Sequence, residues 1–439
     1  MKTSPLRSFG IGFLVCLGCA VLFWGAWGTN SRLKNETRLD FFHFYEAAKA
    51  LTEGEDLYDS GSGGYIYPPL VAVAFQPLAR LDYPAAVWVW FSLNTALVLG
   101  ALILGLKVLG ERLGCPPSTA AQMVIASVAV VLTSEQIRWH LILGQTDTIT
   151  LFGCVLGLFL IDRRPWLAGL VLGSLVAVKY QALIFLPYLL IRGRWSGSIA
   201  YVLGGITALF GPAVILGWEQ NLSYLTVAFG GILEMAGVSV ERAAAVPILT
   251  WDRSITITSG LARIMEANGH STNWAIGLAG GLGAVIAGMT ALLYGRCKLP
   301  FLFARGGAQE KQSPGTRLTL VEWTGLLIAL CAFSPQATKR HLYLLLFVHL
   351  VVCYLWWQAK VPGTRWFLVV GIILSQAALR LPPTPMFSDA AEVWNFIGGP
   401  SWGLIIWCFA VVWAMLKEIQ RLEAEPLSRP SAPASPAIA

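Results

Sequence analysis

The residue best placed for acid–base chemistry is Asp40, which follows closely on the first apolar segment and begins the run Asp-Phe-Phe-His-Phe-Tyr-Glu-Ala-Ala. An ionised carboxylate at this point can act as a general base that takes a proton from an attacking hydroxyl group. It can also cap the helix predicted to follow, by accepting backbone N–H groups. The two roles are compatible, because a capping bond would also hold the carboxylate in place.

A short polar stretch at residues 135–147 separates two apolar segments and carries Arg138, His140, Gln145 and Asp147. A guanidinium group and an imidazole beside a Gly-Gln pair are suited to bind a sugar or a phosphate group. The alternative is that these polar side chains are simply solvated. The stretch is therefore a candidate binding loop.

Lys179 and Gln181 lie between two apolar segments, in the run Ser-Leu-Val-Ala-Val-Lys-Tyr-Gln-Ala-Leu. An ionisable side chain at membrane depth is costly, and it is by default a candidate functional residue. The alternative is that the lysine extends its amine to the membrane surface. The phosphate of a lipid is the obvious anion for such an amine.

A sharp turn at residues 334–341 reads Ser-Pro-Gln-Ala-Thr-Lys-Arg-His and brings together Lys339, Arg340 and His341. Three adjacent donors could stabilise a phosphate group as negative charge develops on it. The alternative is an ordinary short loop between two membrane helices.

Tyrosines and prolines define the far side of the Asp40 loop. Tyr65 and Tyr67 precede Pro68 and Pro69, and Tyr45 lies on the predicted helix after Asp40. Prolines commonly start a helix, and tyrosines commonly lie at a membrane interface. Their gathering in one loop opposite Asp40 makes the tyrosines candidates for contact with a sugar or an acceptor.

The composition predicts an all-α polytopic membrane protein. Of 439 residues, 56% are hydrophobic and 13% are charged. Several apolar stretches have the length of about 20 residues that crosses the hydrocarbon core as a helix. The net charge of +7 is explained by basic loops on the cytoplasmic side and by contact with anionic lipids, so nucleic acid is not an expected partner.

The apolar stretches predict about twelve membrane helices, within a range of about ten to thirteen. The predicted spans are residues 8–28, 84–107, 118–134, 147–161, 165–180, 182–192, 197–218, 273–295, 319–334, 341–358, 365–380 and 401–417. The pair 165–180 and 182–192 is short and could be two broken helices. An amphipathic helix at residues 40–53 is suited to lie at the membrane interface.

The distribution of Lys and Arg in the loops predicts how these segments are oriented in the membrane. We expect 1–28 to be a signal-anchor span, 29–83 a first outer loop, 84–218 and 273–417 the membrane core, 219–272 a second long outer loop, and 418–439 a disordered cytoplasmic tail. This orientation follows the excess of Lys and Arg in cytoplasmic loops. The basic residues that run against it, in short outer segments, are Arg138, Lys179, Lys339, Arg340 and Arg380. Such exceptions invite a functional explanation.

These residues suggest one reaction on the outer face of the membrane. Lys179, Arg138, Lys339 and Arg340, with His341, would hold the phosphate of a lipid-linked sugar. Asp40 would deprotonate an acceptor hydroxyl, which attacks the anomeric carbon from the opposite side and inverts it. The predicted sugar- and acceptor-binding residues are Tyr45, Tyr65, Tyr67, His140, Gln145, Asp147 and Gln181.

The order of these motifs resembles glycosyltransferase family 87. The resemblance rests on Asp40-Phe41 with Leu57-Tyr58-Asp59, on Tyr67-Pro68-Pro69-Leu70, on Gly144-Gln145, and on Ser334-Pro335 with a following His341. It implies a GT-C fold, a polyprenyl-phosphate-sugar donor, mannose as the favoured sugar, a catalytic Asp40 and a catalytic or phosphate-facing His341. The chain departs from the family at Asp147, where an asparagine is common, and residues 219–272 match no motif that we can name.

The expected partners are a polyprenyl-phosphate-sugar donor, a glycolipid or glycan acceptor, and membrane lipids. The first loop has no Asp-x-Asp motif, and the eight cysteines show no ligand spacing, so we expect neither a metal nor a cofactor. Two alternatives remain at this stage: a transporter or flippase of a lipid-linked sugar, and a non-catalytic membrane protein of envelope assembly.

Overall fold

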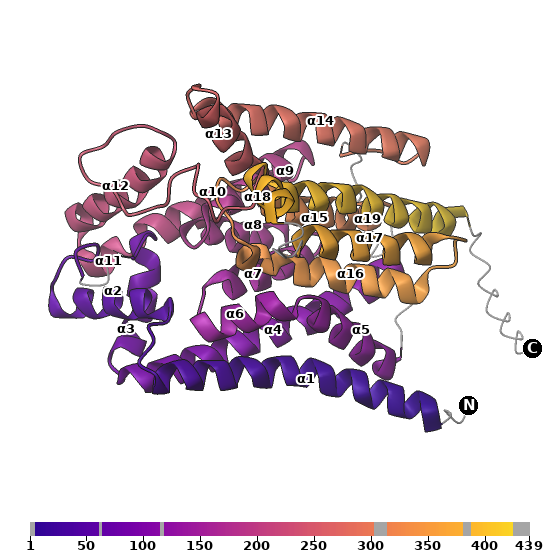
Figure 1. Ribbon diagram of the computed structural model, residues 1–439, viewed down its shortest axis with the longest axis horizontal. Helices are drawn as coiled ribbons and strands as arrows, with labels where there is room; N and C mark the ends of the chain where they lie inside the picture. The colour runs from indigo at the N-terminus through magenta and orange to yellow at the C-terminus, as the bar shows by residue number, and fades with distance from the viewer. Residues whose placement is uncertain (1–4, 61–63, 115–117, 303–313, 381–387, 425–439) are drawn as a thin grey trace, which may run out of the picture.

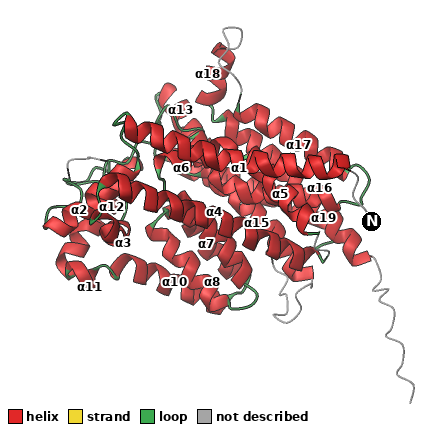
Figure 2. Ribbon diagram, turned by 90° about the horizontal axis from the view of Figure 1, so that it is seen from below, coloured by secondary structure: helices red, strands yellow, loops and turns green. Residues whose placement is uncertain are grey.

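The computed structural model describes residues 5–60, 64–114, 118–302, 314–380 and 388–424, which contain helices and no strands (Figures 1 and 2). The α-helices are α1 (Pro5–Lys34), α2 (Phe41–Glu53), α3 (Pro69–Ala79), α4 (Tyr83–Leu113), α5 (Thr119–Leu132), α6 (Ser134–Leu143), α7 (Asp147–Leu160), α8 (Pro165–Ser174), α9 (Phe185–Ile191), α10 (Trp195–Phe210), α11 (Ala213–Leu216), α12 (Trp218–Met235), α13 (Ile257–Ala267), α14 (Trp274–Arg296), α15 (Pro314–Phe333), α16 (Leu345–Gln358), α17 (Thr364–Leu379), α18 (Ser388–Phe396) and α19 (Gly399–Ala424). Short 3₁₀ helices are η1 (Leu175–Ala177), η2 (Tyr180–Ile184) and η3 (Lys339–Leu344).

The all-α membrane architecture is confirmed. Among the described residues, 7 helices are long and apolar enough to cross a membrane, or up to 8 if α5 and α6, bent by 73° at Thr133, form one broken span. Further apolar helices, including α7 and α17, are shorter. The predicted number of about twelve spans therefore stays a prediction.

The ends of the first and last predicted spans differ from the structure. Helix α1 continues to Lys34, beyond the predicted end at residue 28. Helix α19 continues to Ala424, so the tail predicted for residues 418–439 is helical in its first part. Residues 425–439, like residues 1–4 of the predicted signal anchor, lie outside the described residues.

The break predicted near residue 180 is present. Helix α8 passes through η1 and stops, and η2 and α9 then resume after Lys179, whose backbone is extended at φ −147° and ψ 109°. The extended residue interrupts the helical hydrogen bonds and turns the chain. The broken helix therefore presents Lys179 from a loop rather than from a continuous helix.

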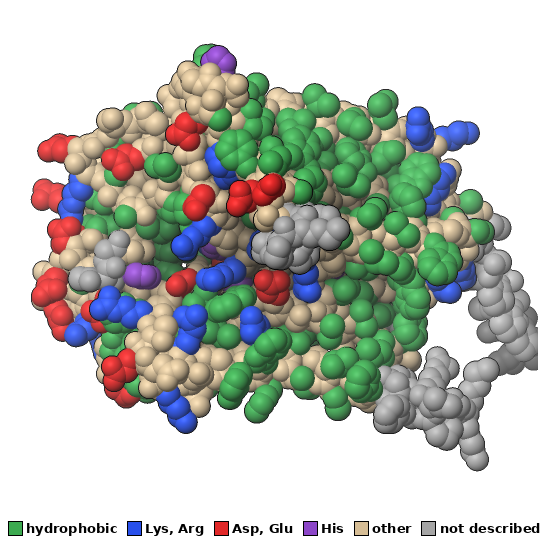
Figure 3. Space-filling view, in the orientation of Figure 1, with side chains coloured by type: hydrophobic (Ala, Val, Ile, Leu, Met, Phe, Trp, Pro, Cys, Tyr) green, Lys and Arg blue, Asp and Glu red, His purple; other side chains and the backbone are tan. Residues whose placement is uncertain are grey.

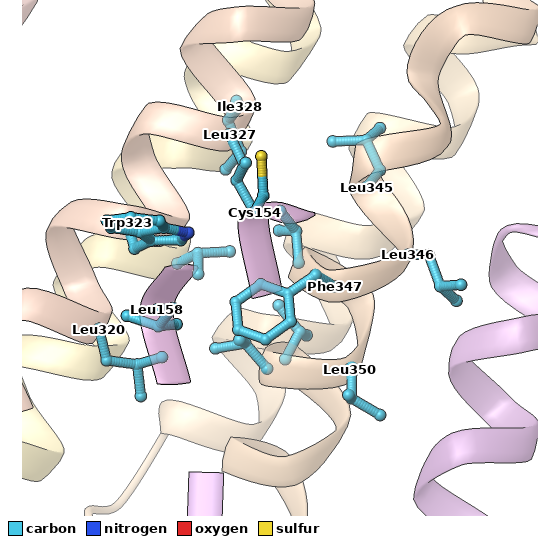
Figure 4. Packing of buried hydrophobic residues seen from close by; sticks show 14 of the residues in the cluster. Cys154, Leu158, Leu320, Trp323, Leu327, Ile328, Leu345, Leu346, Phe347 and Leu350 are labelled. Carbon is cyan, nitrogen blue, oxygen red and sulfur yellow. The ribbon is translucent and has the colours of Figure 1, made fainter. Parts of the chain in front are cut away.

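The centre of the membrane region is packed by α7, α15 and α16. Cys154 of α7, Trp323 and Leu327 of α15 and Phe347 of α16 are each 2% exposed or less. Figure 4 shows these side chains extending into a shared space between the helices. This packing holds the start of α7, which carries Asp147, and the end of α15, which leads into the turn at residues 334–341.

The amphipathic helix predicted from Asp40 onward is α2, but its apolar face does not lie on lipid. Phe41 and Phe44 are 0% and 3% exposed, because they pack on Phe75 of α3 at ring distances of 5.9 and 5.6 Å. Phe41 also stacks on Trp90 of α4. The apolar face is therefore buried within the protein instead of facing lipid, and the placement of α2 at the membrane interface stays a prediction.

The two ends of the molecule differ in charge. Figure 1 places α2, α3, α11 and α12 at one end, here called the α2 end, and both chain termini at the other. In the view of Figure 3, acidic side chains gather along the edge of the α2 end, and basic side chains gather near the opposite end. This distribution agrees with a cytoplasmic position for the termini, which stays a prediction.

Helices α8 and α10 approach so closely that only glycine fits between them. A Cβ atom added at Gly173 would lie 2.0 Å from the carbonyl oxygen of Tyr201, and one added at Gly169 would lie 2.1 Å from that of Gly197. The close approach depends on the absence of side chains at these two positions. It sets the place from which the Lys179 loop begins.

We expect Gly173→Leu to separate α8 from α10 and to lower the melting temperature of the purified protein in detergent. Overpacking of this kind costs about 1–3 kcal/mol or more, because the obstructing atoms belong to the backbone. The control is Gly288→Leu on α14, where an added Cβ meets nothing within 4 Å. Equal melting temperatures for the two variants would contradict the close packing.

Candidate active site

A cavity of about 670 Å³ lies at the α2 end, and many of the predicted site residues line it. Its walls come from the start of α2, the loop before α3, the turn between α6 and α7, the Lys179 break, α12 and the loop before η3. Most of the remaining lining is apolar and includes Leu183, Phe185, Leu209, Phe229 and Ile232. We call this cavity the apolar chamber. The predicted residues that line it are Asp40, Tyr67, Gln145, Asp147, Lys179, Gln181 and His341.

The carboxylate of Asp40 is held by Gln145. Asp40 occupies the N-cap position of α2, but its side chain makes no capping hydrogen bond, so the capping role is wrong. Instead, the Gln145 side-chain amide donates a hydrogen bond to Asp40 Oδ2. One carboxylate oxygen is thereby oriented by the turn between α6 and α7.

The turn that carries Gln145 requires glycine before it. Gly144 has φ +70°, in the left-handed region that favours glycine, and an added Cβ would lie 2.7 Å from Cβ of Phe41. The indole Nε1 of Trp90 donates to the Gly144 carbonyl oxygen at 2.8 Å. These contacts fix the turn against the start of α2, so the distance between Gln145 and Asp40 is set by backbone packing.

A buried charge cluster adjoins the same chamber, which Asp147 and Lys179 line. Asp147 Oδ1 is 3.3 Å from Nζ of Lys179, and Asp147 Oδ2 is 2.9 Å from Nε2 of His140. The Lys179 amine also lies 5.6 Å from the centre of the Tyr67 ring. The lysine predicted to meet a phosphate therefore has a protein counter-ion, which compensates the cost of burying its charge.

His140 contacts protein oxygen atoms through both ring nitrogens. Nδ1 lies 2.8 Å from the carbonyl oxygen of Gln136, and Nε2 lies 2.9 Å from Asp147 Oδ2. These contacts fix the orientation of the ring beside the Lys179–Asp147 ion pair.

His341 presents a hydrogen-bond donor to the cavity. Its Nδ1 accepts the backbone N–H of Thr338 at 3.0 Å, so the neutral imidazole carries its hydrogen on Nε2. His341 lies in the first turn of η3, and its side chain lines the chamber. The arrangement can supply one N–H donor to a bound oxyanion.

A second cavity of about 590 Å³ adjoins the first, and we call it the polar chamber. Asp40, Gln145, Trp251 and His341 line both chambers. The residues that line only the polar chamber are Glu135, Trp139, His140, Leu143, Asp252, Arg253, Ile255, Thr338, Lys339, Arg340 and Asn395. The general-base candidate therefore lies on the boundary between the two spaces.

Comparison with known proteins agrees with this geometry. Residues 65–308, more than half of the chain, match the model of glycosyltransferase family 87. The chain belongs to glycosyltransferase family 87. It is accordingly a membrane glycosyltransferase.

Two curated relatives span most of this family 87 chain. It is 24% identical over 424 residues, covering 90% of this chain and 87% of the relative, to a polyprenol-phosphate-mannose-dependent alpha-(1-2)-phosphatidylinositol mannoside mannosyltransferase of Mycolicibacterium smegmatis. The protein of the same name from Mycobacterium tuberculosis is 24% identical over 399 residues, covering 85% of this chain and 83% of the relative. An alpha-(1->3)-arabinofuranosyltransferase of Corynebacterium glutamicum is 26% identical over 174 residues, covering 37% of this chain and 39% of the relative. No solved structure gives a significant match.

The four residues predicted to bind one phosphate do not come together in this family 87 structure. Lys179 lines the apolar chamber, whereas Lys339 and Arg340 line the polar chamber. Arg138 lines neither cavity, because its guanidinium stacks on Trp24 and Trp139 at 4.2 and 4.9 Å. The expectation of a single site built from all four is therefore corrected.

Two of the predicted sugar-binding tyrosines are structural. The hydroxyl of Tyr45 donates to the Leu81 carbonyl oxygen at 2.8 Å, and that of Tyr65 donates to the Pro68 carbonyl oxygen at 2.8 Å. Both rings are buried in the aromatic cluster between α2 and α3, and neither lines a chamber. Tyr67, in contrast, reaches the apolar chamber, and Gln181 does so while donating to Ser334 Oγ at 2.9 Å.

Two residues that line the apolar chamber, His43 and Trp251, were not predicted from the sequence. His43 lines the apolar chamber one helical turn after Asp40, so the i to i+3 spacing could have indicated it. Burial lowers the pKa of His43 more than the nearby charge of Asp40 raises it, and this favours the neutral ring. Trp251 lies in the region 219–272, where nothing in the sequence predicted a place in the site.

An ion pair connects the Asp40 loop to that same region. Arg242 lies 3.0 Å from Asp56 Oδ1 and 2.9 Å from Asp59 Oδ2, and so connects the segment after α2 to the segment after α12. Burial raises the pKa of Asp56, but the hydrogen bond from Arg242, the backbone hydrogen bonds from Tyr58 and Asp59 and the charge of Arg242 together lower it overall. The contact holds together two segments that contribute walls to the apolar chamber.

Among the residues that the structure describes, no group of three or more His, Cys, Asp or Glu side chains is arranged to hold a metal ion. The expectation that the chain uses no metal stays a prediction. The polar groups that line the two chambers include carboxylate, imidazole, amine, guanidinium, amide and hydroxyl groups.

We expect Lys179→Met and Asp147→Asn to destabilise the protein individually, by about 3–5 kcal/mol when a buried charge loses its partner. The double variant should be less destabilised than the sum of the two, because neither ionised partner remains. Thermal unfolding in detergent measures all four members of this cycle. Additive effects would show that the amine and carboxylate do not interact.

Proposed function

We propose that this family 87 enzyme transfers a mannosyl group from a polyprenyl-phosphate carrier to an acceptor hydroxyl, with inversion at the anomeric carbon. The observation that carries the proposal is the apolar chamber, in which the Asp40 carboxylate and the Lys179 amine face one space with mostly apolar walls. An amphiphilic lipid phosphate has this same combination of an anionic group and an apolar chain. The two relatives that span most of the chain are named for such a donor.

Donor binding follows from the lining of the chamber. The isoprenoid chain would lie against side chains such as Leu209, Phe229 and Ile232, where each buried CH₂ group contributes about 0.8 kcal/mol. The phosphate would lie beside Lys179 and the Nε2–H of His341. Both groups donate hydrogen bonds to oxygen, and a donor that carries a positive charge makes the stronger bond to an anion.

The transfer is a single displacement in this scheme. Asp40 takes the proton of the acceptor hydroxyl, and the oxygen forms a bond to the anomeric carbon as the bond from that carbon to the phosphate oxygen breaks. The phosphate leaves with the electron pair, stabilised by Lys179 and His341. Gln145 keeps the base oriented throughout, and Asp40 then releases its proton to water.

Mannose is the sugar that the comparisons favour. The alignments with the two mannosyltransferase relatives cover 90% and 85% of this chain, whereas the alignment with the arabinofuranosyltransferase relative covers 37%. The general acceptor is a hydroxyl of a glycolipid or glycan. Family membership and a carboxylate between two chambers both favour transfer over the alternatives of a flippase or a non-catalytic assembly protein.

The placement in the cell follows from the charge distribution. We place the enzyme in the bacterial plasma membrane, with the α2 end and both chambers on the outer side. Basic side chains gather near the opposite end, where the chain termini lie (Figures 1 and 3), and cytoplasmic loops carry such an excess. Labelling of single cysteines introduced near Glu53 and near Glu423 with an impermeant reagent would test this orientation.

We expect Asp40→Asn to reduce mannosyl transfer by about 10²- to 10⁴-fold, the usual contribution of a general base. The amide keeps the shape of the side chain but cannot accept the proton. The measurement is transfer of labelled mannose from polyprenyl-phosphate-mannose in membranes that carry the variant.

The matched control for this variant is Asp82→Asn. Asp82 also lies at the α2 end, but its carboxylate caps α4 by accepting the Ala85 N–H at 3.2 Å and lines neither chamber. Both variants should accumulate in the membrane to wild-type amounts. Wild-type transfer by Asp40→Asn would refute the assigned base.

A further inference from the structure

Arg138 lies outside both chambers, and the side chains around it form a cluster of a different kind. Three guanidinium groups lie close to the Trp139 ring, at 4.5, 4.9 and 5.5 Å from its centre, and they belong to Arg340, Arg138 and Arg32. Arg138 also lies 4.2 Å from the centre of the Trp24 ring. We call these three arginines and two tryptophans the Trp139 cluster.

The cluster joins three elements that are distant in the sequence. Arg32 lies in the last turn of α1, Arg138 lies on α6, and Arg340 lies on η3. Helices α1 and α6 are in close contact here, because a Cβ atom added at Gly25 would lie 3.1 Å from the Leu141 side chain. The folded chain therefore brings three cations to one tryptophan, and their spacing in the sequence does not explain it.

No carboxylate pairs with these cations. Among the described residues, none of the three arginines forms an ion pair. Glu135, the acidic residue nearest to Arg138 in the sequence, lies 3.8 Å from Nε of Arg380 instead. Arg340 shares the polar chamber with carboxylates, but Arg32 and Arg138 line neither chamber. Like charges this close repel one another, so an anion beside them would be stabilised.

Contact with an aromatic ring leaves an arginine able to bind a phosphate group. A guanidinium that stacks on a ring uses its flat face, while its N–H donors point outward in its own plane. This planar fork matches two phosphate oxygens at once. Arg138 Nε is buried and has no hydrogen-bond partner among the described residues, so this donor is unused by the protein.

The surroundings of the cluster favour a phosphate that belongs to a lipid. Residues Gly12–Lys34 of α1 form a candidate membrane span, and Phe23, Trp24 and Trp27 on it are 74%, 47% and 61% exposed. Tryptophan and arginine near the end of a span are typical of the headgroup level of a bilayer. A phospholipid can contact the exposed rings with its acyl chains and the arginines with its headgroup, whereas a soluble phosphate has no use for the rings.

We propose that the Trp139 cluster binds the phosphate of an anionic phospholipid at the surface of the protein, where it holds α1 against α6 and η3. A zwitterionic headgroup carries its own cation, which the three guanidinium groups repel, so the site selects an anionic lipid. This binding site is separate from the proposed transfer chemistry. It also accounts for Arg138 and Arg340, two of the basic residues that run against the expected orientation.

The test locates a photoactivatable phosphatidylglycerol on the purified full-length protein. The protein is reconstituted in dioleoylphosphatidylcholine vesicles that contain a trace of phosphatidylglycerol with a diazirine next to its glycerol, and labelled segments are identified by mass spectrometry after illumination. We expect label on the segment that carries Trp24 and Trp27, although phosphatidylcholine is present in large excess. By mass action, a roughly tenfold excess of unlabelled phosphatidylglycerol should lower this label about 10-fold, and soluble glycerol 3-phosphate should not lower it.

Variants separate the cluster from the rest of the surface. Arg32→Gln/Arg138→Gln should lower the label on this segment by about 10-fold or more, while label on other segments changes by less than about twofold. Arg32→Gln alone, at the end of α1, should lower it by about threefold, and Arg32→Lys/Arg138→Lys should keep most of it. The matched control is Arg80→Gln, an exposed arginine at the end of α3 that lines neither chamber, and it should label as wild type.

Four results would overturn the inference. Equal label on this segment in the wild type and in Arg32→Gln/Arg138→Gln would show that the arginines do not hold the lipid. Loss of label from every segment, in the glutamine and lysine variants alike, would show that the arginines serve only the fold. Displacement by glycerol 3-phosphate as effective as that by phosphatidylglycerol would assign the cluster to a soluble phosphate. Loss of label in Arg80→Gln would mean that overall charge, and not the cluster, attracts the lipid.

Discussion

The site depends on the cost of burying charge away from water. Asp147 is 8% exposed and His140 is 1% exposed, and an isolated ion at such a position would cost several kcal/mol. Each charge therefore has a partner, and the partners come from different parts of the chain. Lys179 comes from the break between η1 and η2, His140 from α6 and Asp147 from the start of α7. Electrostatic compensation thus specifies how these three segments are arranged.

The Lys179 amine has two roles in this arrangement. Asp147 is its counter-ion within the protein, and in the proposed reaction the same amine faces the phosphate of the donor. An asparagine at position 147 would leave the lysine without this counter-ion.

Asp40 is positioned by a different kind of force, the packing of backbone and aromatic rings. Phe41 fills the space that any side chain at Gly144 would need, and Trp90 holds the Gly144 carbonyl. Close packing therefore positions the base, whereas an ion pair positions the lysine of the proposed phosphate site. The turn between α6 and α7 contributes to both, because Gln145 contacts Asp40 and Asp147 contacts Lys179.

Much of the architecture was predictable from the sequence because membrane helices leave strong local signals. The apolar lengths predicted the helices, the 3.6-residue period predicted α2 from Phe41 to Glu53, and ionisable residues between apolar segments indicated Lys179 and Asp147. The succession of family motifs predicted the kind of enzyme, and the match over residues 65–308 confirmed it.

Only the tertiary structure decided which candidates share a space. Arg138 was expected at the donor phosphate, but its guanidinium stacks on Trp24 and Trp139. Trp24 comes close to Arg138 only when the chain has folded. Lys339 and Arg340 lie two and one residues before His341 in sequence, yet they line only the polar chamber, while His341 lines both. Local sequence determines the type and spacing of side chains. The packing of distant helices determines which cavity each one reaches, and sequence separation carries little information about that.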